Sequence, residues 1–191
     1  MTKNSLETFT DRVAPIWGSL TSNLAAGCCA HMEELLKTSV AEEWLSSLHN
    51  DAPPYRELYG DPKHGFLLLA HAESKGNYRP PHDHGGGWVI YGVQRGEIEV
   101  GTYARVESLD GRAQLVKRET YVVRPGQCKV FLPGDIHDTR AIAGPVLLFR
   151  FTSCDFVTEE KEGKLRRYVQ RDGGWTDPSP PSSPREVEKT R

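Results

Sequence analysis

The chain has 191 residues and a nearly balanced charge, with 24 Lys and Arg against 26 Asp and Glu and a formal net charge of -2. This length suits one domain with appendages, and no long basic run offers an electrostatic partner to a phosphate backbone or an anionic membrane. Nucleic-acid and membrane partners are therefore not expected, and a small molecule is the ligand class that remains.

The N-terminal residues are polar, and no apolar stretch approaches the roughly 20 residues that span a bilayer. We therefore expect a cytoplasmic protein, either a monomer or a homodimer. The four cysteines, Cys28, Cys29, Cys128 and Cys154, lack the CxxC spacing of a zinc or redox site. Because the chain is long enough to build a core without disulfide bonds, we expect these thiols to be reduced and mainly structural.

Residues 1–52 predict helices that pack on a second region. Apolar residues recur at helical spacing in two stripes, and Pro15 kinks the first stripe or begins a new turn. The stripes consist of Leu6, Phe9, Val13, Ile16 and Trp17, and then of Ala25, Cys28, Cys29, Met32, Leu35 and Leu36. A third, short helix is expected to begin at a capping box, in which Ser39 is followed three residues later by Glu42.

From residue 53 the pattern changes to short apolar runs interrupted by Gly, Pro and Asp, which is typical of an all-β sandwich or barrel. No stretch of ten to fifteen helical residues separates these runs, which favours antiparallel pairing over a doubly wound α/β sheet. We thus predict a mainly β region at 53–171. Strands are expected at 66–72, 87–93, 97–106, 114–123, 127–131, 138–142 and 146–152, with 164–170 as a further candidate.

Residues 172–191 are rich in Gly, Pro, Ser and charge. Such a segment has too little apolar surface to offset its ordering entropy. We expect it to form a flexible tail.

The segment from Pro80 to Trp88, PPHDHGGGW, contains the first candidate metal ligands. Residues two apart in a strand point to the same face, so His82 and His84 can present two imidazoles side by side. A pair of surface histidines fits this spacing equally well. In the second informative segment, residues 126–137, an apolar strand ends in a Pro-Gly turn and His137 opens the next strand.

Together these two segments resemble the two motifs of the cupin superfamily. The resemblance implies a double-stranded β-helix or jelly-roll barrel, in which His82, His84 and His137 converge on one metal ion. Trp88 and Val89 stand where many cupins carry a glutamate ligand. The implied site is therefore neutral and has open coordination positions, unlike structural zinc sites, which normally take four protein ligands. Imidazole suits iron(II), copper, nickel and zinc alike.

Residues 53–152 are similar to the bacterial cysteine dioxygenase-like family, with HDHG-x-x-W as the most specific part and the run from Tyr55 to Leu69 in support. This resemblance implies a mononuclear non-haem Fe(2+) dioxygenase that oxidises a small thiol to a sulfinate with O₂. It also assigns to Arg56 the role of pairing with a substrate carboxylate, for which a guanidinium has suitable geometry. A surface ion pair with Glu57 or Asp61 is the alternative for this arginine.

Two departures from that family bear on the substrate. The cysteine that is cross-linked in the animal enzyme falls at Val89, and the Ser-x-His-x-Tyr relay of the thiol dioxygenases is replaced by LLFRF at 147–151. The alternating apolar residues of this run predict a dry strand face that offers no proton relay to the pocket. Tyr91 and Tyr103, with Tyr168 as a third, are candidates to replace the relay, although each also fits an ordinary strand position.

Two alternatives stay open. One is a three-histidine cupin dioxygenase that cleaves a carbon-carbon bond in a diketone-like substrate, for which an apolar lining from 147–151 is suitable. The other is a non-catalytic, metal-dependent module that binds a small ligand, although no helix-turn-helix or second domain is visible. Gly85 to Gly87 leave room beside a metal or form a simple turn, and Trp88 is either a pocket wall or core.

Overall fold

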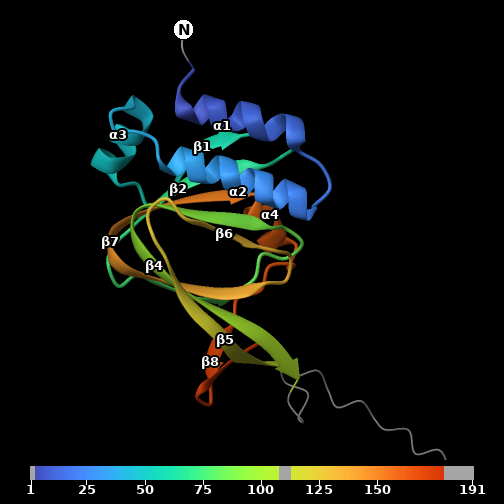
Figure 1. Cartoon of the computed structure of the whole chain (residues 1–191). Coiled ribbons are helices and arrows are strands. Elements are labelled where there is room, and N and C mark those ends of the chain that lie inside the picture. The colour runs from blue at the N-terminus through green and yellow to red at the C-terminus, as the bar shows by residue number, and fades with distance from the viewer. Residues whose placement is uncertain (1–2, 108–112, 179–191) are drawn as a thin grey trace, which may run out of the picture.

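A computed structural model describes residues 3–107 and 113–178 (Figure 1). The chain begins with α1 (Ser5–Val13), a 3-10 turn η1 (Ala14–Ile16), α2 (Ser22–Leu36) and α3 (Glu43–Asp51). The strands follow: β1 (Arg56–Gly60), β2 (Leu67–Glu73), β3 (Tyr78–His82), β4 (Val89–Glu107), β5 (Ala113–Val123), β6 (Cys128–Phe131) and β7 (Ile136–Thr152). A short helix α4 (Phe156–Lys161) and a hairpin of β8 (Val169–Arg171) and β9 (Gly174–Thr176) complete the described part.

All strand pairs are antiparallel, in the order β1-β2-β7-β4-β5-β9-β8, with β3 paired to β7 and β6 paired to β4. Long strands β4 and β7 each join two of the predicted strands, and register shifts between Val93 and Ile98 bend them. Gly96, with φ of 77°, lies in this bend, where an added Cβ would stand 2.5 Å from the carbonyl oxygen of Ala143. The predicted mainly β class with an N-terminal helical segment is confirmed, and the sheet is strongly curled.

Helices α1, α2 and α3 cover one face of the curled sheet (Figure 1). Helix α1 begins at a capping box, because Asn4 accepts from the amide of Glu7 and Glu7 accepts from the amide of Asn4. The capping box predicted at Ser39 and Glu42 is wrong. The carboxylate of Glu42 instead accepts hydrogen bonds from the amide and hydroxyl of Ser5, at 3.0 and 2.8 Å, and α3 has no side-chain cap.

Two apolar layers lie on the two faces of the sheet. On β7, Leu147, Phe149 and Phe151 face the helices, whereas Leu148 packs inside the curl. The helix-side layer also contains Phe9, Val13, Leu24, Cys28, Met32, Leu35, Leu36, Leu45, Leu48, Phe66, Leu68, Ala70, Trp88 and Ile90. The predicted apolar face of 147–151 is therefore real but faces away from the interior of the curl, and Trp88 is core.

A disulfide bond joins Cys29 of α2 to Cys128 of β6, whose Cα atoms lie 6.4 Å apart. The prediction that all four cysteines are reduced is wrong for this pair. The two cysteines are 99 residues apart in the sequence, so no local pattern indicated that the fold brings their sulfur atoms together. Cys28 and Cys154 are free.

The segment predicted as a flexible tail begins with β9, which pairs with β8 and contacts β5 through Gln114 and Thr176. Residues 179–191 lie outside the described part, and the boundaries at 52 and 171 stay predictions. No helix within 3–107 or 113–178 is long and apolar enough to cross a membrane.

Candidate metal centre

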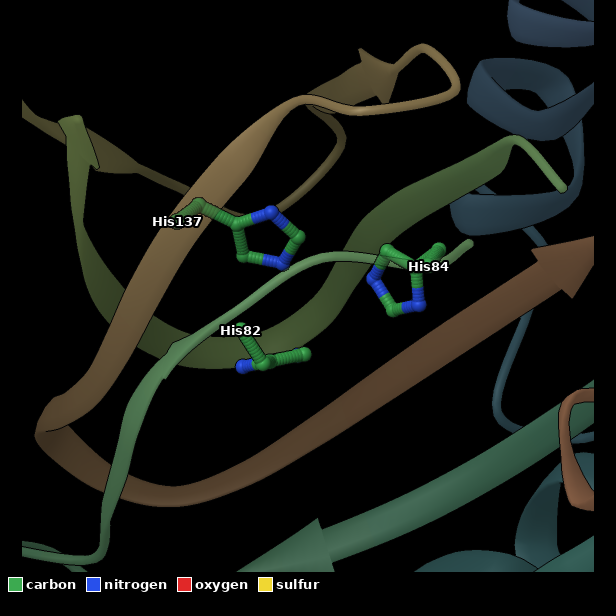
Figure 2. Close-up of side chains that lie close together, drawn as sticks. All are labelled: His82, His84 and His137. Atoms are coloured by element: carbon green, nitrogen blue, oxygen red, sulfur yellow. The ribbon is translucent and has the colours of Figure 1, made fainter. Parts of the chain in front are cut away.

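The structure brings together the three histidines proposed as ligands (Figure 2). His82 ends β3 and lies opposite His137 in the β3–β7 ladder, while His84 lies in the turn that follows β3. Each of the three offers a ring nitrogen within 4.8 Å of the others, and their ring centroids are 4.7 to 5.1 Å apart. These distances allow the three imidazoles to share one ion.

The hydrogen bonds of the three rings leave nitrogen atoms free for a metal. The Nδ1 atom of His82 lies 2.8 Å from the carbonyl oxygen of Pro80, so a proton on Nδ1 leaves Nε2 as the donor to a metal. Nδ1 of His84 and both nitrogens of His137 are buried without a partner among the described residues. Because buried polar atoms are normally satisfied, these unpartnered nitrogens fit a metal site.

The three imidazoles are neutral at pH 7. Burial lowers the pKa of His82 to about 4 and that of His84 to about 2, and it lowers the pKa of His137 well below its usual value. The cause in each case is that an imidazolium ion loses its hydration in the interior. Neutral rings keep the lone pairs that coordination requires.

No carboxylate joins this group within the part of the chain that the structure describes. Asp83 accepts hydrogen bonds from the amides of Gly85 and Arg166, at 3.0 and 2.9 Å. Asp138 accepts from the hydroxyl groups of Tyr78 and Tyr103 and from the amide of Gly101. Both acidic neighbours of the histidines are thus held in other hydrogen bonds.

Aromatic rings fix the positions of two of the imidazoles. Phe131 of β6 stacks on His137 with 3.9 Å between ring centroids, and Phe156 of α4 stacks on His84 at 4.5 Å. The sequence analysis assigned neither ring to the site. Phe131 lies in the same segment as His137, whereas Phe156 lies in a segment that no motif connects to His84.

A cavity of about 340 Å³ opens beside His82 and His84. Its size suits a small molecule. Its wall is mixed in chemistry and comes from β2, β3, β4, β7, α4 and the segment after α4. The other residues that line it are Tyr55, Leu67, Leu69, Tyr78, Arg79, Pro80, Tyr91, Arg150, Thr152, Asp155, Phe156, Val157, Glu160, Leu165 and Arg167.

Tyr91 lies with the histidines, whereas Tyr103 does not. The hydroxyl group of Tyr91 is 3.4 Å from Nε2 of His84, and burial raises its pKa, so it keeps its proton at neutral pH. The hydroxyl group of Tyr103 donates to Asp138 at 2.5 Å, and its side chain packs with Ile136 and Tyr168 outside the cavity wall.

Arg56 is also absent from the cavity wall. Its guanidinium group donates to Ser47 and pairs with Asp51 of α3, each at 2.9 Å. The alternative for Arg56 was an ion pair with Glu57 or Asp61, and the ion pair that the structure shows is with Asp51.

The sequence analysis missed three arginines that line the cavity: Arg79 of β3, Arg150 of β7 and Arg167 after α4. A signal for Arg150 was present. It alternates with the helix-facing residues Phe149 and Phe151, so strand periodicity places it on the opposite face. Arg79 and Arg167 belong to no motif.

Neither a protein-family model nor a curated protein sequence matches this chain. Solved structures match about half of it. KdgF from Halomonas sp. is 19% identical over 51% of this chain and 74% of its own, with a TM-score of 0.40. The Cnp3 cupin domain of Schizosaccharomyces pombe is 14% identical over 57% of this chain and 69% of its own, with a TM-score of 0.41. An oxalate oxidase in complex with glycolate is 24% identical over 46% and 41%, with a TM-score of 0.36. These likenesses are distant, so the chemistry must be argued from this chain's own residues.

Proposed function

We propose that this protein is a mononuclear non-haem iron(II) dioxygenase that oxidises a small thiol to a sulfinate with O₂. The observation that carries the proposal is the group of three buried, neutral imidazoles with unpartnered nitrogens beside a cavity of about 340 Å³. The resemblance of residues 53–152 to cysteine dioxygenase-like proteins supplies the choice of iron and of a thiol.

His82, His84 and His137 would hold the Fe(2+) ion. Bound iron(II) would supply adjacent positions at which a substrate and O₂ are brought together, and it would act as a Lewis acid. All three protein ligands are neutral, so an anionic substrate donor such as a thiolate suits the site. The reaction balances without a further reductant, since both oxygen atoms of O₂ enter the product: RS⁻ + O₂ gives RSO₂⁻.

Tyr91 is the residue that we propose to replace the missing proton relay. Its hydroxyl group lies beside His84 and stays protonated, because burial raises its pKa more than the nearby Arg150 guanidinium lowers it. It can therefore donate a hydrogen bond to a group in the cavity.

The carbon-carbon cleavage alternative loses its main support. It was favoured by an apolar lining from residues 147–151, but Leu147, Phe149 and Phe151 face the helices, and Arg150 is the member of this run that lines the cavity. A non-catalytic binding module and the cytoplasmic location stay as predictions.

Oxygen consumption by the iron-loaded protein tests the proposal. Cysteine, 3-mercaptopropionate, cysteamine and a β-diketone are supplied in parallel, and the products are identified by mass spectrometry. We expect uptake with a thiol and a product heavier by two oxygen atoms. Uptake with the diketone alone would replace the proposal with the cleavage reaction, and no uptake with all four would favour the binding module.

A further inference from the structure

Arg150 is a cation in the cavity wall whose charge no described residue balances. Its strand neighbours are Leu69 on β2 and Tyr91 on β4, and all three line the cavity. Its Nε atom is buried without a hydrogen-bond partner, and the guanidinium group forms no ion pair with residues 3–107 or 113–178. The Phe156 ring, 5.8 Å from Cζ, is the aromatic contact of this group.

The other two arginines of the wall are neutralised. Arg79 pairs with the buried carboxylate of Glu73, at 2.7 Å from Nε and 2.6 Å from a terminal nitrogen. Arg167 pairs with Glu160 through two hydrogen bonds of 2.8 and 3.2 Å. Since each of these pairs sums to zero charge, Arg150 alone remains as an unpaired cation among the three.

A second acid borders the cavity but does not pair with Arg150. Asp155 is exposed, and its carboxylate accepts from the amide of Val157 and the hydroxyl group of Thr158, where it caps α4. Thr152, two residues beyond Arg150 on the same strand face, has a buried hydroxyl group without a described partner. Two polar groups on this face of β7 therefore lack partners in the protein.

A guanidinium group has five N–H donors, and a buried donor without a partner, such as Nε of Arg150, is costly. An acceptor from outside the protein would satisfy it. A carboxylate satisfies this geometry, because two parallel N–H···O bonds can form with one planar partner.

We infer that Arg150 forms an anion subsite and that the natural ligand is a small monocarboxylate, with its carboxylate on Arg150 and its other end toward His82 and His84. This deepens the proposed function by naming the substrate class of the same cavity. One unpaired cation balances one anionic group of the ligand. A second anionic group would be repelled by the carboxylates of Asp155 and Glu160 in the cavity wall. The subsite is on β7 and not at Arg56, where the family resemblance placed it.

Binding measured without turnover tests this inference. Protein loaded with Zn²⁺, which has no redox chemistry, is titrated calorimetrically with 3-mercaptopropionate and with its neutral amide, and then with propionate and propionamide. We expect each acid to bind at least about tenfold more tightly than its amide. Arg150→Gln should abolish this preference and Arg150→Lys should retain part of it. Arg56→Gln, which removes the arginine held by Asp51, should leave the preference intact.

Equal affinities of acid and amide for the wild-type protein would overturn the inference, and so would an unchanged preference in a folded Arg150→Gln variant. If that variant fails to fold, the wild-type comparison and Arg150→Lys still decide the question. Oxygen consumption is measured separately. A protein that prefers acids but consumes no O₂ with any thiol keeps the anion subsite and loses the proposed reaction.

Discussion

At the scale of single residues, two tyrosines on one strand have different surroundings. Tyr91 and Tyr103 both lie on β4 and were both candidates for proton transfer, but the first hydroxyl group lies beside His84 and the second donates to Asp138. Burial and the hydrogen bond to Asp138 raise the pKa of Tyr103, so its hydroxyl group keeps its proton and donates a hydrogen bond to that carboxylate. A role in the reaction is therefore expected for Tyr91 alone.

Replacing these tyrosines separates the two roles. Tyr91→Phe should lower the turnover rate by about a hundredfold, because it removes a positioned hydrogen-bond donor, with metal content unchanged. Tyr103→Phe should retain the rate and lower the free energy of unfolding by about 1 kcal/mol. The rates come from oxygen consumption and the free energies from urea denaturation. A Tyr103→Phe variant that loses activity with full metal content would contradict the assignment.

If the three histidines bind a metal, removing it should lower the melting temperature. A metal that binds only the folded chain stabilises it, so a chelator should lower the melting temperature of metal-loaded protein by about 5–10 °C. The variant His137→Ala should contain little metal and melt at a temperature that the chelator does not change. His64→Ala, which alters a histidine outside the group, is the control. If metal content survives in the His137→Ala variant, the three-histidine group is not the metal site.

At the scale of secondary-structure elements, local patterns predicted the long strands well and the capping contacts poorly. Strand periodicity found β2, β5 and β6 and both halves of β4 and β7. It missed β1, β3 and β9, and the candidate strand at 164–170 overlaps β8 only at its last two residues. Pro80 and Pro81 in β3 argued against a strand. The capping box at Ser39 failed because Glu42 bonds to Ser5 in another helix, a contact between residues far apart in the chain.

Contacts between residues far apart in the chain also limited what could be predicted of the site. The resemblance of two segments to the cupin motifs selected the three histidines, since the spacing of His82 and His84 alone also fits surface histidines. In the structure, the β3–β7 ladder places His82 opposite His137. The role of Arg56 came from a local match, and its partner Asp51 lies on α3, whose position no motif specified. The alternation of apolar residues at 147–151 of β7 predicted a dry strand face. It did not predict that this face packs against the helices.

Helix α4 closes over the metal centre, and its contact with the glycine triplet is testable. An added Cβ at Gly87 would stand 2.5 Å from Phe156 and 2.7 Å from Sγ of Cys154, whereas at Gly86 the nearest atom, on Glu159, is 3.5 Å away. Gly87→Ala should displace Phe156 from His84 and cost about 1–3 kcal/mol of unfolding free energy. Gly86→Ala should cost much less. Equal losses in chemical denaturation would show that Phe156 adjusts without strain.

At the scale of the whole molecule, the disulfide bond between Cys29 and Cys128 joins the helical layer to the curled sheet. A cross-link that closes a loop of about 100 residues restricts the unfolded chain, and native disulfides commonly contribute about 2–4 kcal/mol. Neither cysteine lines the cavity. We therefore expect the bond to act on stability.

Reduction should lower the unfolding free energy by about 2–4 kcal/mol and leave the metal content unchanged. Cys29→Ser should have the same effect and make stability insensitive to reductant, while Cys154→Ser, which removes a free thiol, should keep that sensitivity. Thiol titration of the denatured protein should detect two free thiols before reduction and four after it.

Because a cytoplasm keeps most thiols reduced, the same titration on protein whose thiols are alkylated inside cells tests the predicted location. Four free thiols there would mean that the bond forms only after extraction.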